Sequence, residues 1–187
     1  HVSVPLYPNL NAKTLKKILI HSDSRLLFVG KLDNYTDIKV GVPDGMPCIS
    51  FPFYGEDYPK WEELTAEILP INENVVIDNQ QLASIIYTSG TGGRPKGVML
   101  THKNIYSNLL GASDLLEIIG KKNNKYLSLI PLSHSYEHTA GLYLQVDLGS
   151  EIYFCEGPEK FSSNLLEIEP TLTTAVPRIF EVIHDRI

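Results

Sequence analysis

The chain has 187 residues, of which 43% are hydrophobic and 20% charged, so it can bury one sizeable core and has no disordered or fibrous bias. Its 16 Lys and Arg residues against 22 Asp and Glu residues give a formal net charge of -6, which argues against a general nucleic-acid-binding surface. No apolar run reaches the ~20 residues that span a bilayer. Two distant cysteines, Cys48 and Cys155, indicate reduced thiols in a cytoplasmic protein, with a disulfide left open.

The opening of the chain alternates strands with a helix. Val2–Leu6 is predicted to be a strand that leaves through a proline-rich turn. A helix follows, because Asn11 can cap it and apolar residues recur at helical spacing within Leu15–Leu19. Leu26–Val29 is the next predicted strand, so the opening is β-α-β. The chain begins at His1 without a methionine, and we expect it to be a piece of a longer polypeptide.

The next stretch has weaker patterns. Lys31–Gly55 accumulates prolines and glycines, which indicates irregular structure with one or two short strands, such as Cys48–Phe51. Asp57–Leu69 predicts an amphipathic helix, with acidic residues in its first turn and an apolar face. The residues of that face are Trp61, Leu64 and Ile68.

The second half of the chain repeats one alternation several times. Leu82–Tyr87 predicts a strand buried on both faces, Val98–Leu100 a second strand, and Thr101 can cap a helix that runs to about Glu117. The further predicted strands are Tyr126–Ile130, Ile152–Cys155 and Leu172–Val176, and the further helices Glu137–Asp147, Phe161–Glu167 and Arg178–Ile187. The pattern predicts an α/β fold with a mostly parallel sheet, helices on both faces, and sub-regions 1–78 and 79–187.

A loop of small, hydroxylated and basic residues follows the strand Leu82–Tyr87. Its glycines let backbone N–H groups converge on an anion, and its hydroxyls and lysine add donors and charge, so the loop is typical of a phosphate site. The residues are Thr88, Ser89, Gly90, Thr91, Gly92, Gly93 and Lys96. A P-loop does not fit, because Pro95 precedes Lys96 and no Ser or Thr follows it, and the dinucleotide fingerprint fails as well.

A second polar segment, Pro131–His138, directly follows the predicted strand Tyr126–Ile130. Three interpretations stay open. His134 and His138 have the i,i+4 spacing of zinc ligands on a helix, but no third ligand is evident. A second interpretation is a nucleophilic pair of His134 with Ser133 or Ser135, although adjacent residues seldom point at each other. Ser135 is a candidate helix cap.

Two sequences in these segments resemble one family. Over ten consecutive positions, Thr88–Gly97 resembles the Thr-Ser-Gly-Thr-Thr-Gly-x-Pro-Lys-Gly signature of adenylate-forming enzymes, which include acyl-CoA synthetases, luciferases and peptide-synthetase adenylation domains. Gly92 departs, since the family has a threonine there. Pro131–His138 resembles the second core motif of bacterial long-chain fatty-acyl-CoA synthetases. Val4–Pro8 also resembles the entry strand of that family, and Ala175–Glu181 resembles its later Val-Pro-Arg segment.

The resemblance implies a reaction and roles for residues. A carboxylate attacks the α-phosphorus of ATP, Mg²⁺ accompanies the ATP, and the thiol of coenzyme A then displaces AMP from the acyl-adenylate. Carried over by motif, Thr88–Gly93 and Lys96 would hold the β- and γ-phosphates, while His134 would stand near the acyl carboxylate and α-phosphate. Lys96 and His134 are therefore the expected catalytic residues, and no metal ligand is assigned within the chain.

The resemblance also defines what this chain lacks and which partners to expect. The family's Tyr-Gly-x-Thr-Glu motif and its C-terminal catalytic lysine are absent, so we expect residues 1–187 to be a partial adenylation domain that is inactive alone. Expected partners are fatty acid, ATP and CoA, with no nucleic acid, peripheral membrane contact in the full enzyme, and self-association through an uncovered sheet edge. The alternatives are a ligase for an aryl or amino acid and a non-catalytic nucleotide-binding module.

Overall fold

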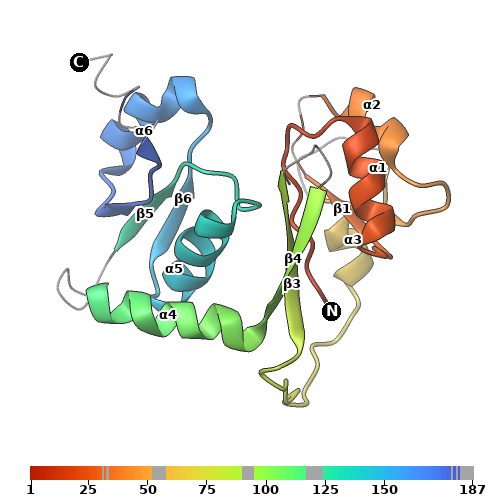
Figure 1. The fold of residues 1–187 in the computed structure, drawn as a ribbon, viewed down its shortest axis with the longest axis horizontal. Coiled ribbons are helices and arrows are strands. Elements are labelled where there is room, and N and C mark those ends of the chain that lie inside the picture. Colours follow the sequence, from red (N-terminus) through yellow and green to blue (C-terminus); the bar gives the residue numbers. More distant parts are fainter. Residues whose placement is uncertain are drawn as a thin grey trace. The chain divides into compact units, whose positions relative to one another are not determined.

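The computed structural model describes residues 1–30, 32, 34–51, 58–89, 95–116, 124–177, 179 and 181. The chain forms two compact units, His1–Met99 and Leu100–Ile187, each of which is described by itself (Figure 1). The sub-regions expected from sequence meet at residue 78, whereas these units divide after Met99. The later division arises because β3 (Leu82–Ser89) pairs with β4 (Pro95–Thr101), and this pairing keeps most of β4 with the first unit.

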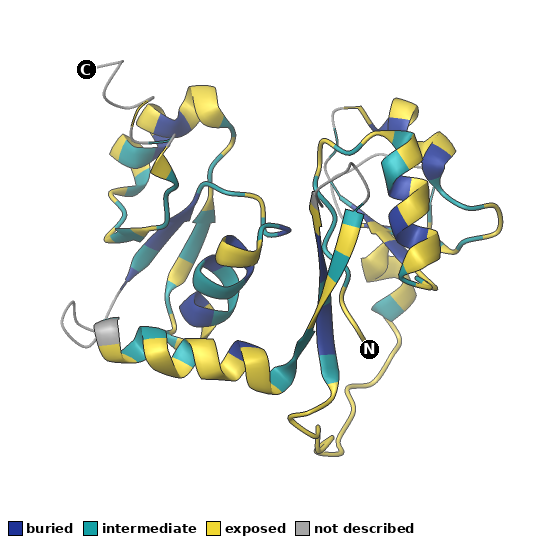
Figure 2. Ribbon diagram, viewed as in Figure 1, coloured by how far each residue is buried: buried dark blue, intermediate teal, exposed yellow. Residues whose placement is uncertain are grey.

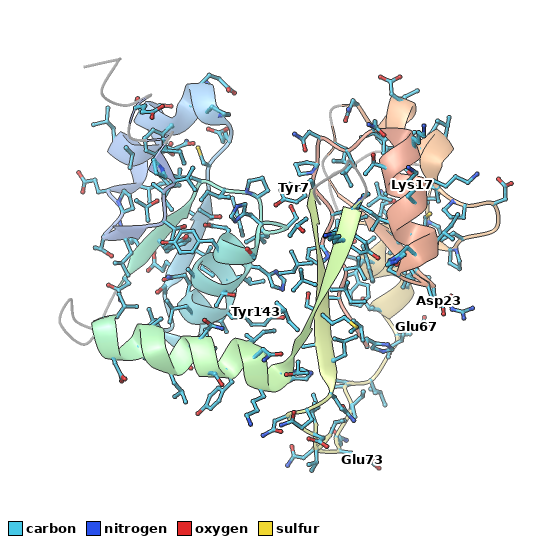
Figure 3. The ribbon with its side chains drawn as sticks, viewed as in Figure 1. Tyr7, Lys17, Asp23, Glu67, Glu73 and Tyr143 are labelled. Atoms are coloured by element: carbon cyan, nitrogen blue, oxygen red, sulfur yellow. The ribbon has the colours of Figure 1, made fainter. Side chains whose placement is uncertain are left out.

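The first unit opens as its sequence pattern predicts. The helix α1 (Ala12–His21) is capped by Asn11, whose Oδ1 accepts the Thr14 N–H at 2.9 Å, and it buries the expected apolar stripe. The opposite face carries exposed lysines, among them Lys17 (Figures 2 and 3). Two short parallel strands, β1 (Leu27–Val29) and β2 (Cys48–Ser50), pair beside α1. Between them lie α2 (Tyr35–Ile38) and the 3-10 helix η1 (Lys39–Gly41).

One hydrophobic cluster joins these elements. It consists of six buried side chains from α1, β1 and α2: Leu15, Leu19, Leu27, Val29, Tyr35 and Ile38. Cys48 of β2 and Tyr58 pack against the cluster, and the Tyr35 hydroxyl donates to the Tyr58 hydroxyl at 2.8 Å. The expected β-α-β opening thus has a core of its own.

Two expectations for the first unit were wrong in extent. Val2–Leu6 forms no strand ladder, only an isolated parallel bridge between Ser3 and Ser84, because Pro5 lacks the N–H that would extend the pairing. The helix expected over Asp57–Leu69 is reduced to α3 (Trp61–Thr65), whose expected apolar face is largely exposed, with Trp61 and Leu64 each 45% accessible. No residue of α3 is buried, so tertiary packing does not support a longer helix.

The strands β3 and β4 form the two-stranded sheet that carries the central loop. Only five residues separate Ser89 from Pro95, too few for a parallel connection, so the pair is an antiparallel hairpin. β3 is covered on both faces, as predicted. Neighbouring residues of a strand point to opposite faces, and the buried residues of β3 include two such neighbouring pairs, Ala83 with Ser84 and Ile86 with Tyr87. This hairpin is an exception to the parallel pairing of the other strands.

The second unit is a three-stranded parallel sheet with helices. β5 (Lys125–Ser128) lies between β6 (Glu151–Phe154) and β7 (Leu172–Thr173), and Figure 1 shows its helices around this sheet. The helices are α4 (His102–Leu116), the π-helix η2 (Glu137–Tyr143), α5 (Leu144–Asp147), the 3-10 helix η3 (Pro158–Lys160) and α6 (Phe161–Ile168). These elements confirm the predicted α/β fold, whereas most of the helix expected over Arg178–Ile187 lies outside the described residues.

Local sequence signals explain the ends of these helices. The hydroxyl of Thr101 accepts the Asn104 N–H at 3.2 Å while Asn104 Oδ1 accepts the Thr101 N–H at 3.0 Å, so the two side chains cap α4 reciprocally. None of the helices among the described residues is both long and apolar enough to cross a membrane.

Candidate functional site

Two residues of the expected phosphate loop have described side chains, one on β3 and one on β4. Thr88 is exposed near the end of β3, and Lys96 is exposed as the second residue of β4. Within the described part of the chain, Lys96 has no ion-pair partner, so its charge is free to meet an anion. The Ser89 side chain lies outside the described residues, and so do Gly90, Thr91, Gly92 and Gly93.

Tyr87, two residues before the end of β3, fixes the position of the β3–β4 hairpin. Its hydroxyl lies 2.6 Å from Nδ1 of His21 in the last turn of α1, and the two rings meet edge to face at 5.8 Å. The same ring covers Gly97 on β4: a Cβ at Gly97 would lie 2.9 Å from Ile85 Cγ2 and 3.2 Å from Tyr87 Cζ. Burial raises the pKa of Tyr87, so the hydroxyl stays neutral. Tyr87 therefore ties both strands of the hairpin to α1.

The second segment, Pro131–His138, follows β5 in the second unit. The His134 N–H donates to the Pro131 carbonyl at 2.8 Å, which forms a turn, and the Tyr136 N–H donates to His134 Nδ1 at 3.2 Å. The imidazole thus accepts one of the first free N–H groups of the following helix and acts as its cap. Because Nδ1 is the acceptor, a neutral His134 carries its proton on Nε2, where it is available as a donor.

Glu137 begins the π-helix and is completely buried, at 0% exposure. Its Oε1 accepts hydrogen bonds from the Ser128 hydroxyl at 2.6 Å and the Tyr126 hydroxyl at 2.9 Å, both on β5. Its Oε2 accepts the hydroxyl of Thr174, just beyond β7. Burial and then the neighbouring negative charge raise the pKa of Tyr126. The carboxylate thus connects two strands to the start of a helix.

His138 is the last residue of this segment and is also buried. Its Nδ1 lies 3.1 Å from the Leu132 carbonyl, to which it donates, and its ring meets Tyr143 (labelled in Figure 3) edge to face at 5.2 Å. Burial lowers the pKa of His138. His138 Nε2 and the Ser133 hydroxyl are buried and have no hydrogen-bond partner among the described residues.

These contacts decide between the interpretations that the sequence left open. The described residues contain no group of three or more side chains suited to a metal ion, so nothing in them supports zinc at His134 and His138. His134 accepts a backbone N–H, with no serine hydroxyl bonded to it among the described contacts, which removes the support for a nucleophilic pair. Ser135 lies inside the helix and is exposed, so the capping side chain is that of His134.

Sequence reasoning identified the two segments but missed the residues that hold them. Glu137 lies in the Pro131–His138 motif, but the sequence assigns it no role. Nothing local links it to Thr174, 37 residues later. His21 lies 66 residues before Tyr87 and looked like the end of an ordinary amphipathic helix. The one available signal was Ser128, a polar position on a predicted core strand, because a buried polar side chain requires a hydrogen-bond partner.

Comparisons with known proteins agree with the resemblance. The family model described as AMP-binding enzyme matches residues 1–186. Among curated relatives, the peroxisomal long chain acyl-CoA synthetase 6 of Arabidopsis thaliana is 30% identical over 98% of this chain. The long-chain-fatty-acid–CoA ligase ACSBG2 of Mus musculus is 32% identical over 95% of it. The chain covers only 28% and 26% of the lengths of these relatives.

Solved structures agree in fold. MbtA of Mycobacterium smegmatis has a TM-score of 0.80 at 20% identity, with 99% of this chain and 36% of that one covered. A benzoate CoA ligase from Burkholderia xenovorans LB400 has a TM-score of 0.79 at 20% identity, with coverage of 96% and 35%. At such identity the likeness concerns the fold alone. Since the family match extends over nearly the entire sequence, the chain belongs to the family of AMP-binding enzymes.

Proposed function

We propose that the protein containing this chain is an AMP-forming long-chain fatty-acid–CoA ligase. The observation that carries the proposal is the ten-residue sequence Thr88–Gly97 on a strand hairpin, in a chain whose 30% and 32% identical relatives are named for long-chain acyl-CoA synthesis. Because the chain covers less than a third of those relatives, the activity is proposed for the complete protein. These residues contribute its phosphate loop and part of its acyl site.

In the first proposed step, an oxygen of the fatty-acid carboxylate bonds to the α-phosphorus of ATP. The bond from that phosphorus to the bridging oxygen breaks, and pyrophosphate leaves with the electron pair. Negative charge therefore grows on the β- and γ-phosphates. Thr88 supplies a hydroxyl donor and Lys96 an unpaired positive charge at the loop, and donors aimed at developing charge are the main catalytic contribution in phosphoryl chemistry.

His134 is proposed to hold the reacting carboxylate and the α-phosphate. With Nδ1 engaged by the Tyr136 N–H, its Nε2–H is the donor that an anionic oxygen requires. In the second step, the thiol of CoA loses its proton to the solvent and its sulfur bonds to the acyl carbon. The bond from that carbon to the phosphate oxygen breaks, and AMP leaves with the electron pair. No described residue of this chain is assigned to that step.

Magnesium would neutralise charge on the ATP phosphates when bound, but the described residues do not fit a magnesium site. They contain no group of three or more candidate ligands. Glu137, an acid in the second motif, is fully buried and already accepts three hydroxyl groups, so it is not available to a metal ion.

The test is an acid-dependent ATP–pyrophosphate exchange assay of the complete protein, followed by detection of the CoA thioester. A panel of palmitate, benzoate and phenylalanine separates the proposed substrate class from aryl and amino acids. We expect the highest kcat/KM with palmitate. Preference for benzoate or phenylalanine would contradict the substrate class, and no exchange with any acid, despite ATP binding, would indicate a non-catalytic nucleotide-binding module.

The expected cytoplasmic location stays a prediction, since the Arabidopsis relative is named as peroxisomal. Peripheral membrane contact and self-association also stay predictions.

A further inference from the structure

We propose that Glu137 is a positioning residue for His134: its buried carboxylate closes the loop that presents the imidazole and fixes which ring nitrogen carries the proton. This inference rests on the proposed function, because it assigns to Glu137 the support of a residue proposed to bind the acyl carboxylate. All of the contacts involved lie within the second unit.

First, Glu137 joins the two ends of the loop that contains His134. Ser128 is the last residue of β5 and Glu137 the first of the π-helix, and their 2.6 Å hydrogen bond joins the two ends of the eight-residue segment between them. The hydrogen bond to Tyr126 holds the same carboxylate further down β5, and the bond to Thr174 holds it to the segment after β7. The loop that contains His134 is thus closed by an anchor with three attachments.

The second step concerns why a carboxylate occupies this position. A buried carboxylate is costly unless its oxygens are hydrogen-bonded, and here three hydroxyl groups satisfy it. Within the described residues it has no cation partner. An apolar side chain would fill the space without fixing a direction, whereas two acceptor oxygens bonded to three hydroxyls define one orientation. The three hydrogen bonds therefore fix the orientation of the Glu137 side chain.

The third step connects Glu137 to the imidazole. Tyr136 directly precedes Glu137, and its N–H is the group that His134 Nδ1 accepts at 3.2 Å. The His138 N–H, on the other side of Glu137, donates to the His134 carbonyl at 2.8 Å. Both neighbours of Glu137 therefore hold His134. If the carboxylate leaves its place, these two N–H groups move with it, and the preference for the Nε2–H tautomer is lost.

Gly141 provides an independent way to displace the carboxylate. It lies one turn along the π-helix, where an added Cβ would be 2.3 Å from Glu137 Oε1 and 2.4 Å from Glu137 Cδ. The three nearest atoms to that Cβ all belong to the Glu137 side chain. Gly141→Ala therefore moves the carboxylate without changing its charge, and the clash disappears when residue 137 is alanine.

The experiment uses the complete protein with Glu137→Ala, Glu137→Gln, Gly141→Ala and His134→Ala, together with the double variants Glu137→Ala/His134→Ala and Glu137→Ala/Gly141→Ala. Matched controls are Glu167→Ala, an exposed acid on α6, and Gly111→Ala, where an added Cβ on α4 meets nothing within 4 Å. Two quantities are measured: kcat and KM for palmitate in pyrophosphate exchange, and the tautomer of His134 from ¹⁵N shifts of the histidine-labelled protein.

We expect Glu137→Ala and Gly141→Ala to lower kcat by about 10²-fold, as misplacement of a reacting group by about 1 Å does. Glu137→Gln, which keeps one acceptor oxygen, should lose less. Each of the two double variants should be little worse than its worse single variant, because its two changes interrupt the same contact. His134 should be the Nε2–H tautomer in the unaltered protein and a mixture in Glu137→Ala and Gly141→Ala. Both controls should match the unaltered protein.

The outcomes separate this inference from the proposed function. An unchanged His134 tautomer in Glu137→Ala, or fully multiplicative losses with His134→Ala, overturns the inference even when the enzyme is an acyl-CoA ligase. A shifted tautomer in a protein without exchange activity supports the positioning role and rejects the proposed function. If Glu137→Ala does not fold, Gly141→Ala and Glu137→Gln provide the same two measurements.

Discussion

The link between Tyr87 and His21 leads to a quantitative prediction about the phosphate loop. Tyr87→Phe removes the hydroxyl that meets His21 Nδ1 at 2.6 Å but leaves the ring over Gly97. The packing of the hairpin is thus preserved while its attachment to α1 is broken. Tyr106, an exposed tyrosine on α4, provides the matched control Tyr106→Phe.

The magnitude follows from the exposure of the two partners. His21 is exposed, so its ring nitrogen can bond to water when the hydroxyl is removed, and no buried group is left without a partner. The expected loss is therefore that of one ordinary hydrogen bond, about 0.5–1.5 kcal/mol. If the anchored hairpin is the form that binds ATP, this loss corresponds to roughly 2- to 12-fold weaker binding.

The assay is titration of the complete protein with ATP, together with urea unfolding of each variant. Tyr87→Phe and His21→Ala should each weaken ATP binding within the stated range, and the double variant should resemble the single ones. Tyr106→Phe should have no effect. The reasoning would be refuted by unchanged ATP affinity in Tyr87→Phe, or by independent, additive effects of the two changes.

Three further predictions concern single residues. Lys96→Ala should lower kcat/KM for ATP by about 10-fold or more, because a hydrogen bond to a charged group is lost. The control Lys103→Ala, on the exposed face of α4, should leave kcat/KM unchanged. Equal effects of the two changes in steady-state kinetics would contradict a specific role of Lys96. Gly92→Thr should raise kcat/KM for ATP in adenylation, because it restores a hydroxyl donor. An unchanged or lower kcat/KM at saturating fatty acid would contradict this role of the hydroxyl. Burial lowers the pKa of His138 from its ordinary 6.5, so the unfolded state binds the proton first: stability should be fully present above that pH and fall as the pH drops through the lower folded-state pKa. In urea unfolding, His138→Leu should flatten the decrease in stability below about pH 6.5, and an unchanged decrease would assign it to other groups.

Local patterns predicted the elements that depend on local interactions. Asn11 and Thr101 are caps, as their side-chain types indicated, and the apolar runs around Leu27, Ile86 and Leu127 are buried strands. These predictions held because capping and burial of a continuous apolar strand are decided within a few residues.

The errors have non-local causes. The face of α3 that contains Trp61 and Leu64 has the right period for burial, but periodicity does not state whether a partner surface is present, and both side chains are about half exposed. The site supports were missed for the same reason, because Glu137 and Thr174 meet only once β5 and β7 are neighbours.

The π-helix after Glu137 has a consequence for how this segment tolerates insertion and deletion. Each residue of an α-helix advances by about 100°, and a π-helical stretch absorbs one surplus residue. Its start is held to β5 by Glu137, and the α5 residues that follow include Leu144 and Gln145, 5% and 3% exposed. Loss of one residue between these points would remove the surplus residue and let the helix become regular, while α5 keeps its orientation and the His134 loop stays closed. A change of one residue in length here would therefore leave Leu144 and Gln145 facing the interior and the proposed acyl-binding segment in place.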